Sequence, residues 1–454
     1  MVYRALYRVI NRDELLSYGD VGAKELLLDL VVSGLEAVNP YNAVRDALAV
    51  RDNVVSIYGR EVRVSGKVYV LGLGKASCSM ARAVEDVLGD LVEEGFVVTK
   101  YGYRMELERI RVLEAGHPIP DENSFRAGVE ALELVERVGV NDLLIVLISG
   151  GGSSLMVYPA NDIGLEDLVR TYDLLVRSGA SIHEINVVRR HLSRVKGGGL
   201  VRHCRGRIIS LIVSDVVGDR LEDIASGPTS ADPTTFHDAH RILRYYGLWD
   251  KVPDTVRKYI LKGLRGEVPE TLKKLPSRVR NYIVASNEIA CKTIYQKALR
   301  RGLNPYILTT TLEGEAKDAA LAIGSIIQEI YRYNRPFTRP ALLIAGGETT
   351  VTVPEEHGLG GPNQEFALSV TRKISGLRGT AVLAIDTDGT DGPTDAAGGL
   401  VDSYTLDRLR EEGIDVVDVL RRHDSYNALK RVSSLVFTGP TMTNVNSLYL
   451  MAIL

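Results

Sequence analysis

Four aspartates and four glycines lie within residues 386–399, directly behind the apolar run 380–385. The apolar run predicts a buried strand, and the glycines after it let the backbone approach a ligand closely. Carboxylate oxygens suit Mg²⁺, which usually keeps several waters and bridges a few carboxylates to nucleotide phosphates. We therefore predict a metal or phosphate site in this segment. An acidic turn after a strand is the alternative. An EF-hand is excluded because no Glu closes a loop of the required pattern.

A second candidate is the segment from Gly72 through Gly74 and Lys75 to Ser77, which follows the apolar run 68–73 and precedes a helical pattern. It departs from a dinucleotide fingerprint, because Ser77 replaces the third glycine and the following strand ends at Lys100 instead of an acid. It also lacks the frame of a P-loop. A lysine at the start of a helix faces anions together with the helix N–H groups. We predict anion binding by Lys75; the alternative is a solvated surface lysine.

Residues 149–154 read Ser-Gly-Gly-Gly-Ser-Ser and follow the apolar run 143–148. Consecutive glycines allow backbone N–H groups to form a concave anion site, to which serine hydroxyls add donors. We predict that Ser149, Gly151 and Ser153 bind a phosphate or a carboxylate. A tight turn in which a serine caps the next helix is the structural alternative.

Two further candidates are a pair of arginines and an aspartate. Arg190 and Arg194 are four residues apart and share one face of a predicted amphipathic helix, so they could clamp a substrate carboxylate. Ordinary capping of a helix C-terminus by cations is the alternative. Asp215 follows the apolar run 208–213 and could orient or deprotonate a hydroxyl. His117, which lies in a Gly-His-Pro sequence, is predicted to be a turn residue.

The elements that must position these residues are short apolar runs without alternation, separated by helical patterns. Such runs indicate parallel strands covered on both faces, and ligands bind beyond the carboxyl ends of strands in these sheets. We predict an α/β protein with two domains and largely parallel sheets covered by helices. The boundary is placed in the charged, proline-containing stretch 262–280. This gives a Rossmann-like N-terminal domain over 1–268 and a C-terminal α/β domain over 269–454.

Composition narrows the functional classes. A chain of 454 residues is too long for one ordinary core. The formal net charge of −3 gives no general attraction to nucleic acid or membranes. The three cysteines are far apart, which argues against disulfides and zinc and fits a reducing compartment. No apolar segment follows Met1, so we expect no secretory signal, and no apolar run approaches the roughly 20 residues needed to span a bilayer. We expect a cytoplasmic protein that binds neither nucleic acid nor membranes.

Taken together, the motifs resemble the class II glycerate kinases, a family with a two-domain α/β architecture and a C-terminal glycine-rich domain of the MOFRL type. The resemblance covers most of the chain, because the matching segments run in order from Gly72 to Asn446. They are 72–76, 116–121, 148–154, 185–193 with 196–198, 214–219 with 226–229, 345–349, 360–365, 386–399 and 438–446.

The resemblance implies ATP-dependent phosphorylation of D-glycerate, usually at the 2-hydroxyl, to give 2-phosphoglycerate. It places the active site in the cleft between the domains and matches Lys75 to the lysine that meets the transferring phosphate. Two departures stand out: Pro362 occupies a position that is usually arginine, and Met442 one that is usually glycine. The role of the missing arginine must therefore pass to another cation, with Arg190 and Arg194 as candidates.

Phosphoryl transfer needs positioning and charge neutralisation more than covalent chemistry. On that logic we assign Asp215 as the base and place Mg²⁺ at Asp386 and Asp388. The nucleotide is predicted to lie near four residues of the second half of the chain: Asn287, Gly346, Gly347 and Glu348.

Two other functions stay open at this point. One is an NAD(P)H-dependent hydroxypyruvate reductase, which also acts on a small hydroxy acid, although Ser77 and Lys100 count against it. The other is a non-catalytic nucleotide-binding sensor. The choice between a monomer and a homodimer is also open.

Overall fold

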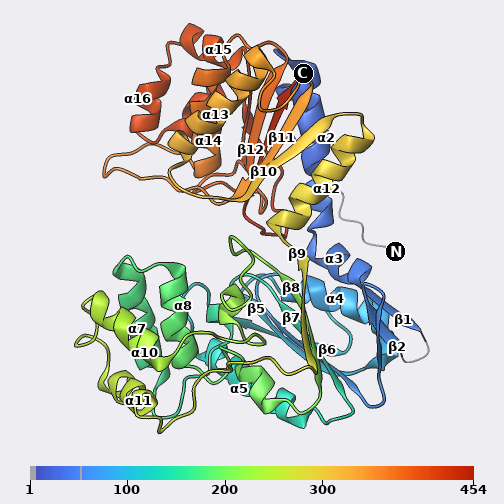
Figure 1. The fold of residues 1–454 in the computed structure, drawn as a ribbon, viewed down its shortest axis with the longest axis vertical. Helices are drawn as coiled ribbons and strands as arrows, with labels where there is room; N and C mark the ends of the chain where they lie inside the picture. Colours follow the sequence, from blue (N-terminus) through green and yellow to red (C-terminus); the bar gives the residue numbers. More distant parts are fainter. Residues whose placement is uncertain (1–6, 52–53) are drawn as a thin grey trace. The chain divides into compact units, whose positions relative to one another are not determined.

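The computed structural model describes residues 7–51 and 54–454. These residues form two compact units (Figure 1). One unit is continuous and covers Pro40–Val284. The other combines the N-terminal residues 7–39 with Ala285–Leu454, and is therefore built from two separate parts of the chain.

The continuous unit contains a six-stranded sheet with the order β6-β5-β4-β7-β8-β9. The pairings from β6 to β8 are all parallel. Numbered along the chain, this is the order 3-2-1-4-5-6 of the doubly wound dinucleotide-binding fold. The strands are β4 (Val68–Leu73), β5 (Val92–Lys100), β6 (Ile110–Ala115), β7 (Leu143–Ile148), β8 (Arg207–Val213) and β9 (Val279–Ala285).

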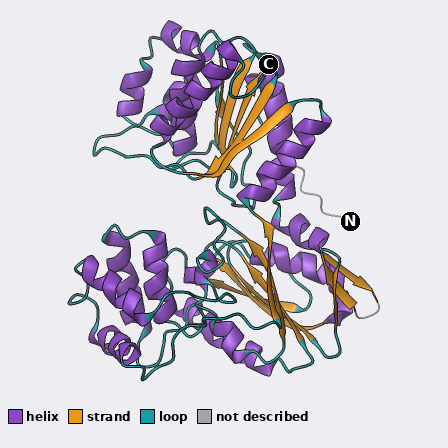
Figure 2. Cartoon of the chain, viewed as in Figure 1, coloured by secondary structure: helices purple, strands orange, loops and turns teal. Residues whose placement is uncertain are grey.

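Both faces of this sheet are covered by helices, as Figure 2 shows. All residues of β4 and β7 are buried, which explains why their sequences are continuously apolar. The side chains of Tyr69, Leu71 and Leu73 pack with helix α5 (Glu122–Arg137). Alternate residues point to the opposite face, and there Gly72 approaches Ser77 at the start of α4 (Ser77–Leu88).

The remaining elements of this unit lie outside the six-stranded sheet. A small antiparallel sheet, β1-β2-β3, follows helix α3 (Pro40–Ala47). Four helices share a core of their own around Phe236, Leu168 and Val188. They are α7 (Leu165–Arg177) and α8 (Ile182–His191), which lie between β7 and β8, and α10 (Phe236–Tyr245) and α11 (Asp254–Leu264), which lie between β8 and β9. Two short helices, α6 (Gly152–Leu155) and α9 (Gly199–His203), also lie between β7 and β8. The strands of the small sheet are β1 (Leu48–Arg51), β2 (Val54–Ile57) and β3 (Arg60–Arg63).

The second unit has a mixed six-stranded sheet with the order β10-β11-β15-β12-β13-β14. Only the β10–β11 pairing is parallel; β15 runs antiparallel to both β11 and β12, and β13 antiparallel to both β12 and β14. The prediction of two α/β domains is confirmed, but the largely parallel sheet expected in the second one is wrong. The strands are β10 (Asn304–Leu312), β11 (Ala341–Gly347), β12 (Thr380–Asp386), β13 (Gly398–Asp402), β14 (Leu435–Val436) and β15 (Ser447–Ile453).

Helices cover this second sheet on both sides (Figure 1). Helices α13 (Ala316–Tyr333) and α14 (Pro362–Ile374) pack on one face, around Phe366 and Tyr449. Helices α2 (Val21–Ala37) and α12 (Asn287–Arg300) pack together against the strands on the other face. Three shorter helices, α15 (Thr405–Glu411), α16 (Val416–Arg421) and α17 (Ser425–Arg431), follow β13.

The N-terminal segment is held in the second unit by buried polar contacts. The Lys24 ammonium lies 3.3 Å from Asp402, and both side chains are almost inaccessible to solvent. The backbone N–H of Asp20 donates to the same carboxylate at 2.9 Å, and the Ser403 hydroxyl donates to Asp20 at 2.6 Å. A buried charge requires such partners, so this segment cannot be separated from residues 285–454 without a large cost.

The compact units therefore differ from the predicted division at residue 268. Residues 7–39 belong with the C-terminal part, for the reason just given. Residues 269–284 stay with the first unit, because β9 joins its sheet and the N–H of Ile208 donates to the carbonyl of Arg278 at 3.0 Å. Backbone hydrogen bonds between strands leave little signal in the sequence, so the prolines of residues 262–280 did not mark the boundary between the compact units.

Two smaller expectations can also be compared with the structure. The spacing of the cysteines argued against disulfides, and in the structure Cys78, Cys204 and Cys291 are buried and free. Over the part of the chain that is described, no helix is both long and apolar enough to cross a bilayer.

Candidate functional site

The loops after β4 and β7 meet at the point where the strand order of the first sheet reverses. The Lys75 N–H donates to the carbonyl of Gly150 at 2.9 Å, and the Ala76 N–H donates to the Ser149 hydroxyl at 3.0 Å. A Cβ atom on Gly74, whose φ is +121°, would lie 2.3 Å from the Ser149 hydroxyl oxygen. Only glycine fits this crossing of two loops. Ligands of doubly wound sheets bind at this topological switch point.

Three side chains converge on the glycines of this crossing. A Cβ atom on Gly150 would lie 2.1 Å from the Asp215 carboxylate, and one on Gly151 would lie 2.8 Å from the His117 ring and 3.4 Å from Cγ of Lys75. We name the group formed by Lys75, His117, Gly150, Gly151 and Asp215 the switch-point cluster. The structure thus brings together the lysine, the glycine loop and the aspartate that were predicted separately from their positions after three different strands.

Electrostatics sets the protonation of this cluster. Burial raises the pKa of Asp215, while the nearby Lys75 ammonium opposes that rise. Burial, assisted by Lys75 and Lys100, lowers the pKa of His117 to about 4. His117 is therefore neutral near pH 7, so that one ring nitrogen can donate a hydrogen bond to a ligand carboxylate and the other can accept one from a ligand hydroxyl.

His117 was predicted to be a turn residue, but its ring lies at the switch-point cluster. A usable signal existed in the sequence. His117 follows β6, whose carboxyl end lies at the same edge of the sheet as the ends of β4 and β7, since these strands are parallel.

In the glycine loop 149–154, backbone N–H groups are more available to a ligand than the serine hydroxyls are. Over the described residues, the N–H groups of Gly150 and Gly151 make no hydrogen bond within the protein. The Ser153 hydroxyl, in contrast, shares a hydrogen bond with Ser226 at 2.8 Å, and the Ser149 hydroxyl is used by Ala76. The predicted role of Gly151 in anion binding keeps its geometric support, while Ser149 and Ser153 brace the loop.

The two predicted clamp arginines are used elsewhere in the first unit. Arg190 is buried, donates to Asp223 at 3.0 Å and lies 3.2 Å from Asp232. It holds two acidic loops together and is not free to bind a substrate. Arg194 stacks over the Tyr158 ring, 4.4 Å from its centroid, and lines a different cavity. The clamp assignment is therefore not supported for either residue.

The neighbouring Arg189, which was not predicted as a site residue, lies where the predicted clamp arginines were expected, on the wall of a cavity that residues of the glycine loop also line. It lines a cavity of about 850 Å³ whose wall includes Ser153, Ser154 and Pro118, and these residues adjoin Gly151 and His117 in sequence. Its guanidinium stacks on Tyr172, 4.8 Å from the ring centroid. Among the described residues it has no ion pair, and its Nε has no hydrogen-bond partner. Adjacent helix positions point about 100° apart, so sequence alone could not choose between Arg189 and Arg190.

In the second unit, the predicted metal residues lie where β12 ends. Asp386 accepts the N–H of Asp388 at 3.0 Å. The segment 438–446 covers this turn: the Thr441 N–H donates to the Asp388 carbonyl at 3.1 Å, and the Thr387 N–H donates to the Asn446 carbonyl at 3.3 Å. The Asn446 amide also donates to the Glu348 carboxylate at 3.0 Å. We name Asp386, Asp388 and Glu348 the carboxylate cluster.

The charges of the carboxylate cluster fit a hard cation. Burial, reinforced by Asp388, Asp391 and Glu348, raises the pKa of Asp386 well above its ordinary value. Within the described residues, neither Asp386 nor Asp388 forms an ion pair, so a divalent cation would relieve their repulsion. No group of three or more His, Cys, Asp or Glu side chains in the described chain is arranged to enclose a metal. A protein usually supplies only one or two carboxylates to Mg²⁺, and water and phosphate oxygens complete the coordination.

The other two acids of segment 386–399 are structural. Asp391 accepts the N–H groups of Asn363 and Gln364 at 3.0 and 2.8 Å, and thereby caps α14. Burial raises the pKa of Asp391 to about 6, and these hydrogen bonds limit the rise. Asp395 accepts the hydroxyl of Tyr426 at 2.8 Å. Pro362, for which the sequence resemblance implies arginine, begins α14 beside the Asp391 cap.

The predicted nucleotide residues gather at the same end of the second sheet. The Asn287 amide donates to the carbonyls of Val445 and Ser447, both at 2.9 Å. A Cβ atom on Gly346 would lie 1.6 Å from Asn287, and one on Gly347 would lie 2.3 Å from the Leu312 nitrogen. These contacts make Asn287 and both glycines necessary for the backbone arrangement. A nucleotide role for them, and for Glu348, stays a prediction.

The geometry and the sequence together define a class of protein. A family model described as "Domain of unknown function (DUF4147)" matches residues 26–261, and the MOFRL family model matches residues 341–447. The chain belongs to the glycerate kinase family that combines these two domains.

Particular relatives agree over nearly their whole length. The chain is 58% identical to the glycerate 2-kinase of Pyrococcus horikoshii, over 94% of this chain and 96% of that one. It resembles the crystal structure of the Thermotoga maritima glycerate kinase with a TM-score of 0.85 and 40% identity, covering 95% of this chain and 100% of that one. It is also 40% identical to an Agrobacterium vitis protein provisionally named hydroxypyruvate reductase, over 95% of both chains.

Proposed function

We propose that this chain transfers the γ-phosphoryl group of ATP to the 2-hydroxyl of D-glycerate in the presence of Mg²⁺, giving 2-phosphoglycerate and ADP. The observation that carries the proposal is the switch-point cluster, in which Lys75, two free N–H groups and Asp215 meet. The names of the Pyrococcus and Thermotoga relatives support the reaction class.

Each member of the switch-point cluster has a role in this reaction. Asp215 accepts the proton of the acceptor hydroxyl, for which its raised pKa makes it a better base than an ordinary aspartate. Lys75 and the N–H groups of Gly150 and Gly151 neutralise charge on the phosphoryl oxygens, which is the main contribution a protein makes to such a transfer. Neutral His117 orients the acceptor through one ring nitrogen.

Arg189 is proposed to bind the carboxylate of glycerate. Arg189 forms no ion pair among the described residues and lines the cavity shared with Ser153 and Ser154. A planar guanidinium matches a carboxylate through two parallel hydrogen bonds. This assignment supplies a substrate cation in a chain where proline replaces the family arginine at position 362.

The carboxylate cluster is proposed to hold the metal of the nucleotide. Asp386 and Asp388 would bind Mg²⁺, which when bound neutralises charge on the nucleotide phosphates. Asn287, Gly346, Gly347 and Glu348 are proposed to shape the nucleotide site beside it. The expected location between the two domains, the cytoplasmic setting and the choice between monomer and homodimer all stay predictions.

The test is the reaction itself, with D-glycerate, ATP and Mg²⁺ and the product identified by phosphorus NMR. We expect a 2-phosphoglycerate signal that disappears when Mg²⁺ is omitted. A 3-phosphoglycerate signal would keep the kinase and reverse the pose of the acceptor. ATP binding without any product would favour the sensor alternative.

The reductase alternative has one observation in its favour, the provisional name of the Agrobacterium relative. The geometry favours it less. Where a dinucleotide fold has its third glycine, the Ser77 hydroxyl donates to the carbonyl of Val98 at 2.9 Å and fills the space between helix and strand. Where it has an acid for the ribose, β5 ends at Lys100. NADH oxidation with hydroxypyruvate, followed by absorbance, separates the two functions.

A further inference from the structure

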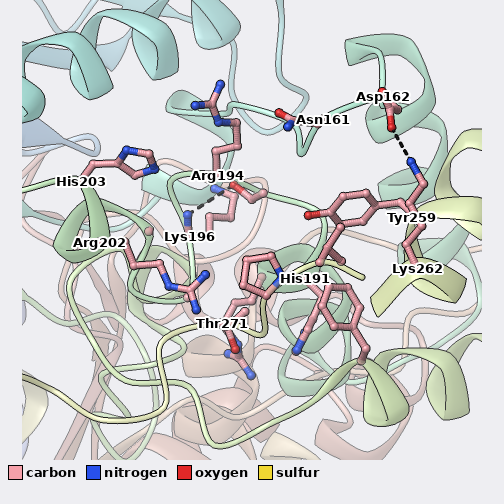
Figure 3. A pocket seen from close by; sticks show the side chains of 17 residues that line it. Asn161, Asp162, His191, Arg194, Lys196, Arg202, His203, Tyr259, Lys262 and Thr271 are labelled. Carbon is pink, nitrogen blue, oxygen red and sulfur yellow. Dashed lines mark hydrogen bonds and ion pairs between the residues drawn. The ribbon is translucent and has the colours of Figure 1, made fainter. Parts of the chain in front are cut away.

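The first unit contains a second, more enclosed cavity of about 300 Å³, shown in Figure 3. None of the residues of the switch-point cluster lines it. Its wall carries five Lys or Arg side chains and a single carboxylate, that of Asp162. The cations are Arg190, Arg194, Lys196, Arg202 and Lys262, with His191 and His203 beside them.

Several of these cations are already neutralised. Arg190 pairs with Asp223 and Asp232, and Lys262 lies 2.8 Å from Asp162. The Lys196 ammonium donates to the carbonyls of Ser153 and Met156 at 2.7 and 3.1 Å, and burial lowers its pKa to about 7. These residues shape the wall of the cavity and are already engaged with other groups of the protein.

The two imidazoles also have acidic neighbours. His203 lies 3.0 Å from Glu136. His191 is held between the Val187 carbonyl and Glu270, which is 3.2 Å away. Burial alone would raise the pKa of Glu270, but hydrogen bonds from His191 and the Phe236 N–H lower it to about 2. Neither histidine is therefore a free cation in the cavity.

Two guanidinium groups form no ion pair among the described residues, although the Glu270 carboxylate attracts one of them, Arg202. Arg194 stacks on Tyr158 and forms no ion pair. Arg202 donates to the backbone carbonyl of Glu270 and likewise forms no ion pair. Figure 3 shows the Tyr259 side chain reaching into the space that these two arginines border. Burial raises the pKa of Tyr259, so its hydroxyl is a proton donor at neutral pH.

We propose that this cavity is a binding site for a small phosphate ester that carries a second anionic group, such as a phosphorylated three-carbon acid. Two unpaired arginines and a hydroxyl donor suit phosphate and carboxylate oxygens, which accept bidentate hydrogen bonds from guanidinium. The volume lies at the lower end of the range of about 300–1,000 Å³ for small-molecule pockets, which selects a compact ligand. The inference does not depend on the kinase reaction.

The experiment is calorimetric titration of the full chain with 3-phosphoglycerate as the probe, without nucleotide or metal. We compare the unaltered protein with Arg194→Gln, Arg202→Gln and Lys75→Ala. Arg241→Gln is the matched control, because Arg241 is exposed, pairs with Asp238 and lies outside the cavity wall. Thermal unfolding of each variant checks that the fold is kept.

We expect saturable binding that each cavity variant weakens roughly tenfold or more, since each loses hydrogen bonds to a charged group. Arg241→Gln should bind like the unaltered protein, and Lys75→Ala should keep the binding that the two cavity variants lose. Inorganic phosphate should bind more weakly than the probe, because it lacks the second anionic group. Two results would overturn the proposal: no binding to the unaltered protein at millimolar probe, or binding lost in Lys75→Ala and kept in both cavity variants.

Discussion

The switch-point cluster and the carboxylate cluster gather groups of opposite charge at the ends of two different kinds of sheet. The first gathers a cation and free N–H groups where parallel strands end, while the second gathers acids beside a central antiparallel strand. In the parallel sheet all functional loops follow strands. In the mixed sheet the three carboxylates also end or follow strands, but Asn446, which donates to Glu348, precedes one, because β15 enters the same edge with its N-terminal end. A search confined to residues that end or follow strands therefore reaches the members of both clusters, but it does not reach Asn446, which holds Glu348.

The two units also differ in how they are held together, and removing Asp402 should show the largest effect. Asp402→Ala leaves the buried Lys24 ammonium without its partner, which should cost about 3–5 kcal/mol of unfolding free energy in the unit that contains both. The only tryptophan, Trp249, lies in the other unit. In urea, circular dichroism should therefore show an early transition that tryptophan fluorescence does not.

Asp407→Ala is the control for this variant, because Asp407 is an exposed acid near Asp402 that pairs with Arg410. If the two aspartate variants unfolded at the same urea concentration, the N-terminal segment would not be anchored as described.

Within the switch-point cluster, Lys75→Ala should lower kcat by about 10²–10³-fold, the usual cost of removing one group that stabilises transition-state charge. Turnover of D-glycerate with ATP measures it. Lys67→Ala serves as the control, because Lys67 is an exposed lysine of the same unit that pairs with Glu93. Near-normal turnover in Lys75→Ala would remove the lysine from the mechanism.

Arg189→Ala should raise the KM for glycerate by roughly tenfold or more, because a hydrogen-bonded charge is lost from the substrate. The effect on kcat should be smaller, and Arg189→Lys should restore part of the affinity. Arg190→Lys, in contrast, should act mainly on stability, since Arg190 is buried between two carboxylates. A KM effect confined to the Arg190 variant would reverse the assignment made from the structure.

In the carboxylate cluster, Asp386→Asn should raise the Mg²⁺ concentration for half-maximal activity by roughly tenfold or more, at least the loss seen for an outer-shell partner of a metal ligand. Asp395→Asn is matched to it, since it removes one charge from the same segment at a residue bonded to Tyr426. Equal Mg²⁺ requirements in the two variants would argue against a metal at Asp386.

The smallest expected effect is a shift of the pH profile. The base must be ionised, and burial raises the pKa of Asp215 above its ordinary value of 3.8. Activity should therefore fall on the acidic side at a higher pH than an ordinary aspartate would give. Because Lys75 favours the ionised form, Lys75→Ala should move this limb to still higher pH.

His117→Gln tests the origin of that limb, since His117 titrates near pH 4. The acidic limb of the pH profile should remain in the variant. If it disappeared, the limb would be assigned to His117 instead of Asp215.

How far the sequence predicts the site differs between the two clusters for a physical reason. Lys75, Gly151 and Asp215 were predicted as site residues because apolar runs mark buried parallel strands, and such strands all end at one edge. His117 was missed although it obeys the same rule, because its Gly-His-Pro setting is also typical of a turn. The residues before β15, above all Asn446, carry no such signal, since strand direction is set by long-range pairing.

The sequence by itself determined the α/β class, the family and the positions of the main loops, because these depend on local patterns of apolar residues, glycines and acids. Only the tertiary structure decided which of two neighbouring arginines, Arg189 and Arg190, pairs with carboxylates. Arg189 and Arg190 are chemically identical neighbours, and Asp223 and Asp232 reach Arg190 from distant loops. The same holds for the N-terminal segment, whose attachment to Asp402 joins residues almost 400 positions apart through a buried charge pair that no local pattern records.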